Sequence, residues 1–226
     1  MRRSALVVRG GWEGHDPVPT TDLFIPRLEE LGFDVTVEDA LEVYADEDTM
    51  DRTDLVVQAW TNGEILADEL AGLRRAVEAG TGLAGWHGGL LDSFRGATDF
   101  HHLVGGQFVA HPGDLIDHEI RVVPDRAEHP VLEGLEPTLA LRSEQYWVQT
   151  DAADDVLVET THAVREGQPW SEPVTVPVVW TRQWGAGRVF ACTVGHSVET
   201  LADPWVFRVI EQGMVWAARD GEGGAG

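Results

Sequence analysis

The chain contains no lysine. All 16 of its basic residues are arginine, and they face 39 Asp and Glu residues, which gives a formal net charge of −23. The absence of lysine excludes Schiff-base catalysis and a P-loop phosphate site. Contacts to phosphate need clustered positive charge, so this composition disfavours nucleic acid and anionic membranes as partners. We therefore expect a small-molecule ligand, with no nucleic-acid and no membrane partner.

Cysteine and long apolar runs are also scarce. The single cysteine, Cys192, excludes an intrachain disulfide and a zinc site built from several cysteines. No apolar run approaches the ~20 residues of a membrane-spanning helix. The run from Ala5 to Val8 is too short for the apolar core of a signal peptide. These features predict a cytoplasmic protein.

The first half of the chain alternates short apolar strands with amphipathic helices. Its length of 226 residues and its 43% of hydrophobic residues suit one large domain with a sizeable core. The strand–helix order predicts a parallel sheet with helices on both faces. The expected strands cover 4–9, 33–38, 55–60 and 81–86, and the expected helices cover 20–31, capped by Thr20 or Thr21, and 64–79.

The second half predicts an antiparallel region. Strands are expected at 116–123, 141–148 and 156–161, and a short helical segment at 100–104. The segments 176–184 and 188–194 flank Gly185-Ala186-Gly187, which is typical of a hairpin with a three-residue loop. A last helix runs from Asp203 or Pro204 to about Ala218. We expect one domain over residues 1–219 and a flexible glycine-rich tail over 220–226.

A glycine-rich turn after the fourth expected strand is the main functional signal. Gly85-Trp86-His87-Gly88-Gly89 has the spacing of a nucleophile elbow, with His87 where a hydrolase carries serine or cysteine. Such an elbow leads from a strand into a helix, here expected from Leu90, and exposes one side chain above the sheet. Histidine is a poor acyl-transfer nucleophile but a good proton carrier or metal ligand. We therefore expect a site centred on His87.

Other polar residues are expected at the same edge of the sheet. His15, His87 and His196 each lie beside glycine just after an expected strand, and ligands of open α/β sheets bind outside the carboxyl ends of strands. Any one of these histidines alone would suit a capping or surface role, but three together indicate one pocket. Glu144 and Tyr146 are two residues apart and so share one face of a strand.

Tryptophan is abundant, with nine residues. Flat indole rings suit the C–H faces of sugars, and they equally suit a core or an oligomer interface. Trp12 and Trp86 flank the expected site and, with Asp16 beside His15, are candidate substrate-binding residues. An exposed antiparallel edge and many tryptophans also favour a symmetric homo-oligomer.

Three kinds of chemistry compete for this site. A cysteine amidotransferase needs cysteine at position 87, whereas Cys192 lies within an expected strand. A serine hydrolase needs serine there, and Ser197 lacks the elbow context. Acid–base chemistry by histidines and a carboxylate, with or without a divalent metal such as zinc, uses the residues present.

Short motifs follow one another in order through residues 5–218. They are Gly14-His15-Asp16, Gly82 to His87, Gly105 to Phe108 with His111, His129-Pro130-Val131 to Gly134-Leu135, Glu144-Gln145-Tyr146, Pro177 to Trp180, Gly185 to Phe190, Gly195-His196-Ser197 and Val215 to Ala218. Together they resemble the ThuA-like family, named for trehalose utilisation.

The resemblance implies a fold and a function. The fold is a flavodoxin-like, three-layer α/β sandwich like that of class I glutamine amidotransferases, without the catalytic cysteine. The implied role is carbohydrate catabolism on a disaccharide or its 3-keto derivative. The family's motif positions fall on His15, His87, His111, Glu144, Tyr146 and His196, with His111 and Tyr146 as substrate-binding candidates. Trp86 stands where an aliphatic residue is common, which is expected to reshape the pocket.

The favoured hypothesis is an enzyme that cleaves a keto-sugar glycoside supplied by a separate oxidoreductase. His87 would remove the proton at C2, while His196 or His15 would protonate the leaving group or hold a metal. Glu144 would orient a reacting group or serve as a metal ligand. Two alternatives stay open, namely a non-catalytic sugar-binding or regulatory module and a metal-dependent hydrolase of an ester or amide.

Overall fold

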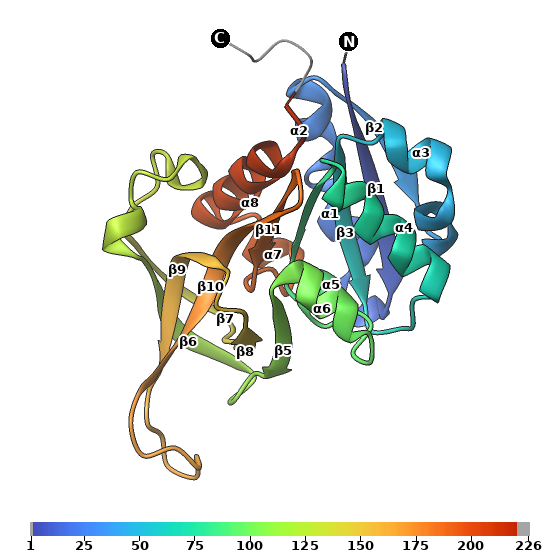
Figure 1. The fold of residues 1–226 in the computed structure, drawn as a ribbon. Helices are drawn as coiled ribbons and strands as arrows, with labels where there is room; N and C mark the ends of the chain where they lie inside the picture. The colour runs from blue at the N-terminus through green and yellow to red at the C-terminus, as the bar shows by residue number, and fades with distance from the viewer. Residues whose placement is uncertain (1, 221–226) are drawn as a thin grey trace.

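The protein is described by a computed structural model that covers residues 2–220. A nine-stranded sheet of order β2-β1-β3-β4-β11-β10-β9-β6-β7 runs through the molecule (Figure 1). Of the tail expected over 220–226, residues 221–226 lie outside the described residues. Among residues 2–220, no helix combines the length and apolarity needed to cross a bilayer.

Five neighbouring strands form the parallel half of the sheet. They are β1 (Arg3–Gly11), β2 (Phe33–Glu38), β3 (Leu55–Thr61), β4 (Gly82–Trp86) and β11 (Gly187–Cys192). Side chains of a strand point alternately to its two faces, and Ala5 and Val7 accordingly lie in one apolar cluster while Leu6 and Val8 lie in another. Both faces are therefore buried, and all five carboxyl ends meet at one edge.

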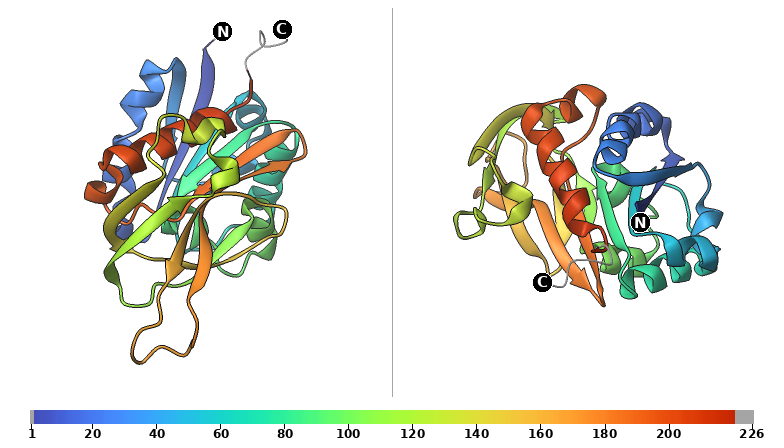
Figure 2. Two further views of the ribbon diagram at one scale, coloured as in Figure 1. Left: turned by 90° about the vertical axis from the view of Figure 1, so that its left-hand side faces the viewer. Right: turned by 90° about the horizontal axis from the view of Figure 1, so that it is seen from above.

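Helices cover each face of the parallel strands, as expected. Figure 2 shows α2 and α8 on one side and α4 on the other. The first layer comprises α1 (Pro17–Asp22), α2 (Ile25–Glu30), α7 (Val198–Leu201) and α8 (Pro204–Ala217). The second comprises α3 (Glu47–Arg52), α4 (Ala67–Glu78), α5 (Gly88–Leu91) and α6 (Thr98–Val104). Short 3-10 turns occur at η1 (Glu13–His15), η2 (Leu41–Ala45), η3 (Pro124–Arg126) and η4 (Pro130–Leu132).

The antiparallel half extends the same sheet. Its strands are β10 (Val174–Trp184), β9 (Asp155–His162), β6 (Leu115–Val122) and β7 (Thr138–Glu144), and β5 (Gly106–Ala110) pairs with β8 (Trp147–Thr150) in a small second sheet. The expected hairpin of β10 and β11 is present, but Trp184 pairs with Gly187, so the loop has two residues instead of three. Gly185, with φ of 60°, supplies the positive φ that such tight hairpin loops need.

Three expectations for individual elements are wrong. The helix expected over 20–31 is two helices, because Pro26 lacks the N–H that would continue α1 and instead lies in the first turn of α2. Thr20 and Thr21 lie inside α1, where their hydroxyls donate to the carbonyls of Asp16 and Pro17, so neither is a cap. The strand expected over 141–148 is divided between β7 and β8, in different sheets, and β5 was not predicted.

Candidate functional site

The elbow at His87 has the geometry that its sequence predicts. His87 adopts φ 50° and ψ −142° between β4 and α5, a conformation that costs a non-glycine residue ~1–3 kcal/mol. Its N–H donates to the carbonyl of Cys192 on the neighbouring strand at 2.7 Å. Gly88 follows because the ring of His15 lies where a side chain would begin. A Cβ at that position would be 2.3 Å from the His15 ring.

Backbone strain gathers around this elbow. Within the described part of the chain, five non-glycine residues have a positive φ, and four of them belong to the site or adjoin one of its residues. These four are Asp16, Asn62, His87 and Asp114. Strained conformations of this kind persist where surrounding contacts fix them, which is a common property of functional sites.

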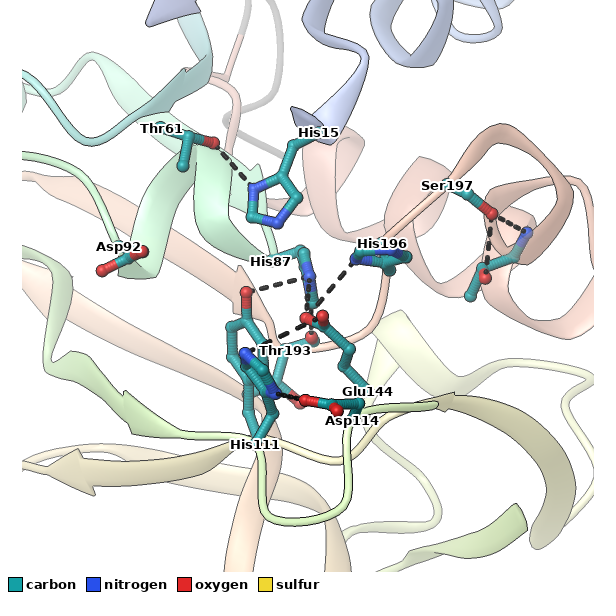
Figure 3. Close-up of polar contacts among 12 residues, drawn as sticks. His15, Thr61, His87, Asp92, His111, Asp114, Glu144, Thr193, His196 and Ser197 are labelled. Carbon is teal, nitrogen blue, oxygen red and sulfur yellow. Dashed lines mark hydrogen bonds and ion pairs between the residues drawn. The ribbon is translucent and has the colours of Figure 1, made fainter. Parts of the chain in front are cut away.

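Four side chains converge at the elbow, as Figure 3 shows. His15, His87, His196 and Glu144 each offer one ligand atom, and these atoms all lie within 4.8 Å of one another. The rings of His15 and His87 are 4.8 Å apart between centroids, and each is 5.4 Å from the ring of His196. The structure therefore brings the three expected histidines into one place, with Glu144 arriving from the end of β7.

His15 reaches the cluster by a route that strand order alone does not provide. Strand β3 separates β1 from β4, so the strands before His15 and His87 are not neighbours. The turn η1 carries His15 across the end of β3, where its Nδ1 lies 3.0 Å from the Thr61 hydroxyl. Thr61 was not predicted as a site residue, although it is the last residue of β3 and so also lies at the carboxyl end of a parallel strand.

The hydrogen bonds of His87 fix its tautomer. Its Nδ1 lies 2.8 Å from the carbonyl oxygen of Thr193, which can only accept, so Nδ1 carries the hydrogen. In the neutral ring Nε2 therefore bears the lone pair, and it lies 2.9 Å from the Tyr146 hydroxyl and 3.1 Å from Glu144 Oε2. A lone pair and a carboxylate at this distance need a proton or another cation between them.

The four residues fit a divalent metal. His196 Nδ1 is buried 3.4 Å from Glu144 Oε2 without a well-aligned hydrogen bond, which leaves a donor atom unused. Three imidazoles and one carboxylate are ligands that zinc accepts. The contacts of His87 and His15 to Thr193 and Thr61 are of the kind that orients metal-binding imidazoles.

Burial and mutual repulsion hold two of the histidines neutral. Burial, followed by the charges of His87 and His196, lowers the pKa of His15 to about 3, and burial also lowers the pKa of His87. Burial acts to raise the pKa of Glu144, but contacts with His196 and His87 outweigh it and hold that pKa below its usual range. The contact with Glu144 raises the pKa of His196. Near neutral pH the cluster therefore offers an ionised carboxylate and two neutral imidazoles, the states that metal binding requires.

Tyr146 and His111 extend the site beyond these four residues. The Tyr146 ring stacks on His87 at 4.1 Å between centroids, and burial raises the pKa of its hydroxyl. His111 Nε2 lies 3.9 Å from Glu144 Oε1, and its Nδ1 lies 3.2 Å from Asp114 Oδ1. Asp114 was not predicted, although its position three residues after His111, in a Pro-Gly turn, is visible in the sequence.

The remaining candidates separate into rim and core. Trp12 is 53% exposed and meets the edge of His15 at 4.9 Å, so its ring is free to contact a ligand. Asp16 is exposed beside it, and its charge acts to raise the pKa of His196.

The assignment of Trp86 to substrate binding is wrong. It is 3% exposed and lies 4.9 Å from Phe24, within the apolar cluster that also contains the buried residues of α8.

The substitution Gly88→Ala tests the close approach of His15 to the elbow. We expect a loss of about 1–3 kcal/mol in the free energy of unfolding, because the new methyl group displaces a packed ring. Urea unfolding measures this loss. The matched control is Gly96→Ala, where a Cβ meets nothing within 4 Å, and it should change stability by less than about 0.5 kcal/mol. Equal effects of the two substitutions would contradict the packing argument.

Comparisons with solved structures find the same fold in two bacterial proteins. A putative ThuA-like protein from Bacteroides uniformis ATCC 8492 is 18% identical, with a TM-score of 0.73 over 96% of this chain and 91% of its own. A putative ThuA-like protein from Parabacteroides merdae ATCC 43184 is 17% identical, with a TM-score of 0.74 over 96% and 90%. At these identities the likeness concerns the fold alone.

A third structural relative carries a location in its name. This cytoplasmic protein from Salmonella typhimurium LT2 is 12% identical, with a TM-score of 0.67 over 96% of this chain and 100% of its own.

A search of curated proteins gives no match. The family model described as trehalose utilisation, ThuA, matches residues 4–217. With nearly its whole length matched, the chain belongs to the ThuA family.

Proposed function

We propose that this protein is an enzyme of carbohydrate catabolism that cleaves a disaccharide or a 3-keto-glycoside by acid–base chemistry. The observation that carries the proposal is the cluster of three imidazoles and one carboxylate at the carboxyl edge of the sheet. Trehalose utilisation, the description of the matching family, supplies the substrate class. The exposed ring of Trp12 beside His15 supports a sugar ligand.

The proposal extends to the fold class, the cellular location and the oligomeric state. The order β2-β1-β3-β4-β11 among parallel strands matches the flavodoxin-like order, which supports a three-layer sandwich related to class I amidotransferases. The name of the Salmonella relative supports a cytoplasmic location. A homo-oligomer paired through the β7 edge stays a prediction.

A 3-keto-glycoside suits the site because its bond cleavage needs only proton transfers. The C3 carbonyl acidifies the proton at C2. Removal of that proton forms the C1=C2 double bond as the C1–O bond breaks, and the departing oxygen takes up a proton. A divalent metal held by His15, His87, His196 and Glu144 would act as a Lewis acid on the carbonyl oxygen.

The geometry favours a holding role for His87 over the base role expected from the sequence. His87 is 1% exposed, its Nδ1 donates to Thr193, and its Nε2 meets Tyr146 and Glu144. A base must reach the proton that it removes. The exposed ring of Trp12 beside His15 supports a role in holding a sugar ring over the cluster, and Tyr146 keeps the lone pair of His87 occupied until a ligand or ion competes for it.

The decisive experiment offers the purified protein 3-ketotrehalose and, separately, trehalose. We expect glucose and an unsaturated keto sugar from the first, since the keto group acidifies C2. Product from trehalose as well would show that the enzyme acts on the disaccharide itself, and its absence would restrict the substrate to the 3-keto-glycoside. Chromatography with mass detection measures both products. Saturable binding without product would contradict the enzyme proposal and favour a sugar-binding module. Turnover of esters or amides instead would favour a metal-dependent hydrolase.

A further inference from the structure

His111 approaches the cluster from the opposite wall. It lies in the loop between β5 and β6, in the antiparallel half, whereas the other three histidines follow strands of the parallel half. Its Nε2 faces Glu144 Oε1 at 3.9 Å, which is too long for a hydrogen bond and leaves this nitrogen free for a ligand atom. Its side chain is 34% exposed, against 25% for His196 and 1% for His87. His111 therefore combines access from solvent with a nitrogen directed at the site.

The loop that carries His111 is shaped to place a carboxylate behind it. Residues Pro112 and Gly113 make a tight turn in which the Asp114 N–H donates to the His111 carbonyl at 3.0 Å. Asp114 has φ of 53°, a strained value for a non-glycine residue. This turn sets Asp114 Oδ1 3.2 Å from His111 Nδ1. Figure 3 shows the two side chains facing each other. The pair is within reach but not aligned as a hydrogen bond, and catalytic hydrogen bonds often align only when substrate is bound.

The aromatic ring of Phe108 restrains the orientation of the His111 imidazole. The Phe108 ring stacks on His111 with centroids 5.6 Å apart and an interplanar angle of 27°, and Phe108 in turn lies 4.5 Å from Tyr146. A carboxylate at Nδ1 favours the tautomer with hydrogen on that nitrogen and leaves the Nε2 lone pair facing the site. Phe108 thus packs on one flat side of the ring, and the Asp114 carboxylate lies behind it within reach of Nδ1.

We propose that His111 is the catalytic acid–base residue of this site and that Asp114 is its positioning residue. His111 Nε2 takes the proton as the C2–H bond breaks, and the C1=C2 double bond forms while the C1–O bonding pair leaves with the departing oxygen. The proton on Nε2 then passes to that oxygen. Atoms and electrons balance without an oxidant or reductant. The assignment rests on the proposed function, and it separates the proton carrier from the four residues that suit a metal.

The test compares His111→Ala and Asp114→Asn with the unchanged protein on 3-ketotrehalose. For His111→Ala we expect kcat to fall by ~10²–10⁴ while the metal content per chain stays constant. Imidazole in the buffer should restore part of the rate, because it replaces the missing base in the space left. For Asp114→Asn we expect kcat to fall ~10–100-fold, since a misoriented imidazole transfers protons poorly, with KM changed less than about twofold.

The matched control is His102→Ala, because His102 is exposed and packs edge-on against Trp184 outside the cluster. Its kcat and KM should equal those of the unchanged protein. An unchanged rate in His111→Ala, a fall in metal content with the rate, or no recovery with imidazole would each overturn the assignment. In all three cases turnover by the unchanged protein keeps the proposed function intact. If the unchanged protein shows no turnover of 3-keto-glycosides, both the function and the assignment are wrong.

Discussion

Replacing His87 with alanine should abolish turnover of the keto-glycoside and the retention of a divalent metal together. His87 contacts two other residues of the site, because its ring stacks on Tyr146 and its Nε2 lies close to Glu144. Loss of groups that merely orient metal ligands costs ~10–100-fold in affinity, so loss of this ligand should cost at least ~100-fold. The rate should fall by a comparable or larger factor.

Metal affinity is measured by competition with a chromophoric chelator, and turnover by chromatography. Circular dichroism must show an unchanged fold, since His87 also holds a strained backbone position. His102→Ala serves again as the matched control, because it removes an imidazole outside the cluster. A His87→Ala protein that binds metal as tightly as the unchanged chain would show that the cluster is not a metal site.

Bound zinc should stabilise the folded chain, and the stabilisation should grow as the pH rises. At free zinc about 1,000 times the dissociation constant, a site present only in the folded state adds ~4 kcal/mol to the free energy of unfolding. Metal binding requires neutral imidazoles. Burial keeps the pKa of His15 at about 3, so His15 stays neutral in mild acid, and burial also lowers the pKa of His87.

His196 decides the pH range of this effect. Its contact with Glu144 raises its pKa, so it is the first of the three to gain a proton as the pH falls. In the metal-free chain, the protonated pair of His196 and Glu144 adds stability that is present in acid and lost as the pH rises through the raised pKa. The zinc-dependent part has the opposite sign, because zinc and the proton compete for the same nitrogen.

Urea unfolding with and without zinc, at pH values on either side of the raised pKa of His196, measures the zinc-dependent part. Glu144→Gln is the informative variant, since it removes one ligand and also the group that raises the pKa of His196. Its zinc-dependent stabilisation should be small at every pH. Glu133→Gln, at an exposed turn residue, should leave the effect unchanged. A zinc effect that is constant with pH would contradict the competition argument.

Several features of the site follow from the sequence because they depend on local geometry. Glycines around His87 specify a tight strand-to-helix turn, and the structure shows that turn with a positive φ at His87. Alternating strands and helices place the carboxyl ends of β1 and β4 at one edge, whereas β11 joins that edge through its long-range parallel pairing with β4. Turn geometry and the alternation of strands and helices involve neighbours in the chain, so a single sequence carries them.

Long-range packing decided the features of the site that the sequence did not predict. Glu144 ends β7, at the far side of the sheet from β4, and only the path of the antiparallel half brings it to 3.1 Å from His87. The division between β7 and β8 at Gln145 and Tyr146 is invisible to a pattern that reads 141–148 as one strand. Trp12 and Trp86 look alike in sequence, but one lies on the rim and the other in the core. The sequence by itself determined the turn and the order of the elements, whereas pairing between distant strands determined which side chains share the site.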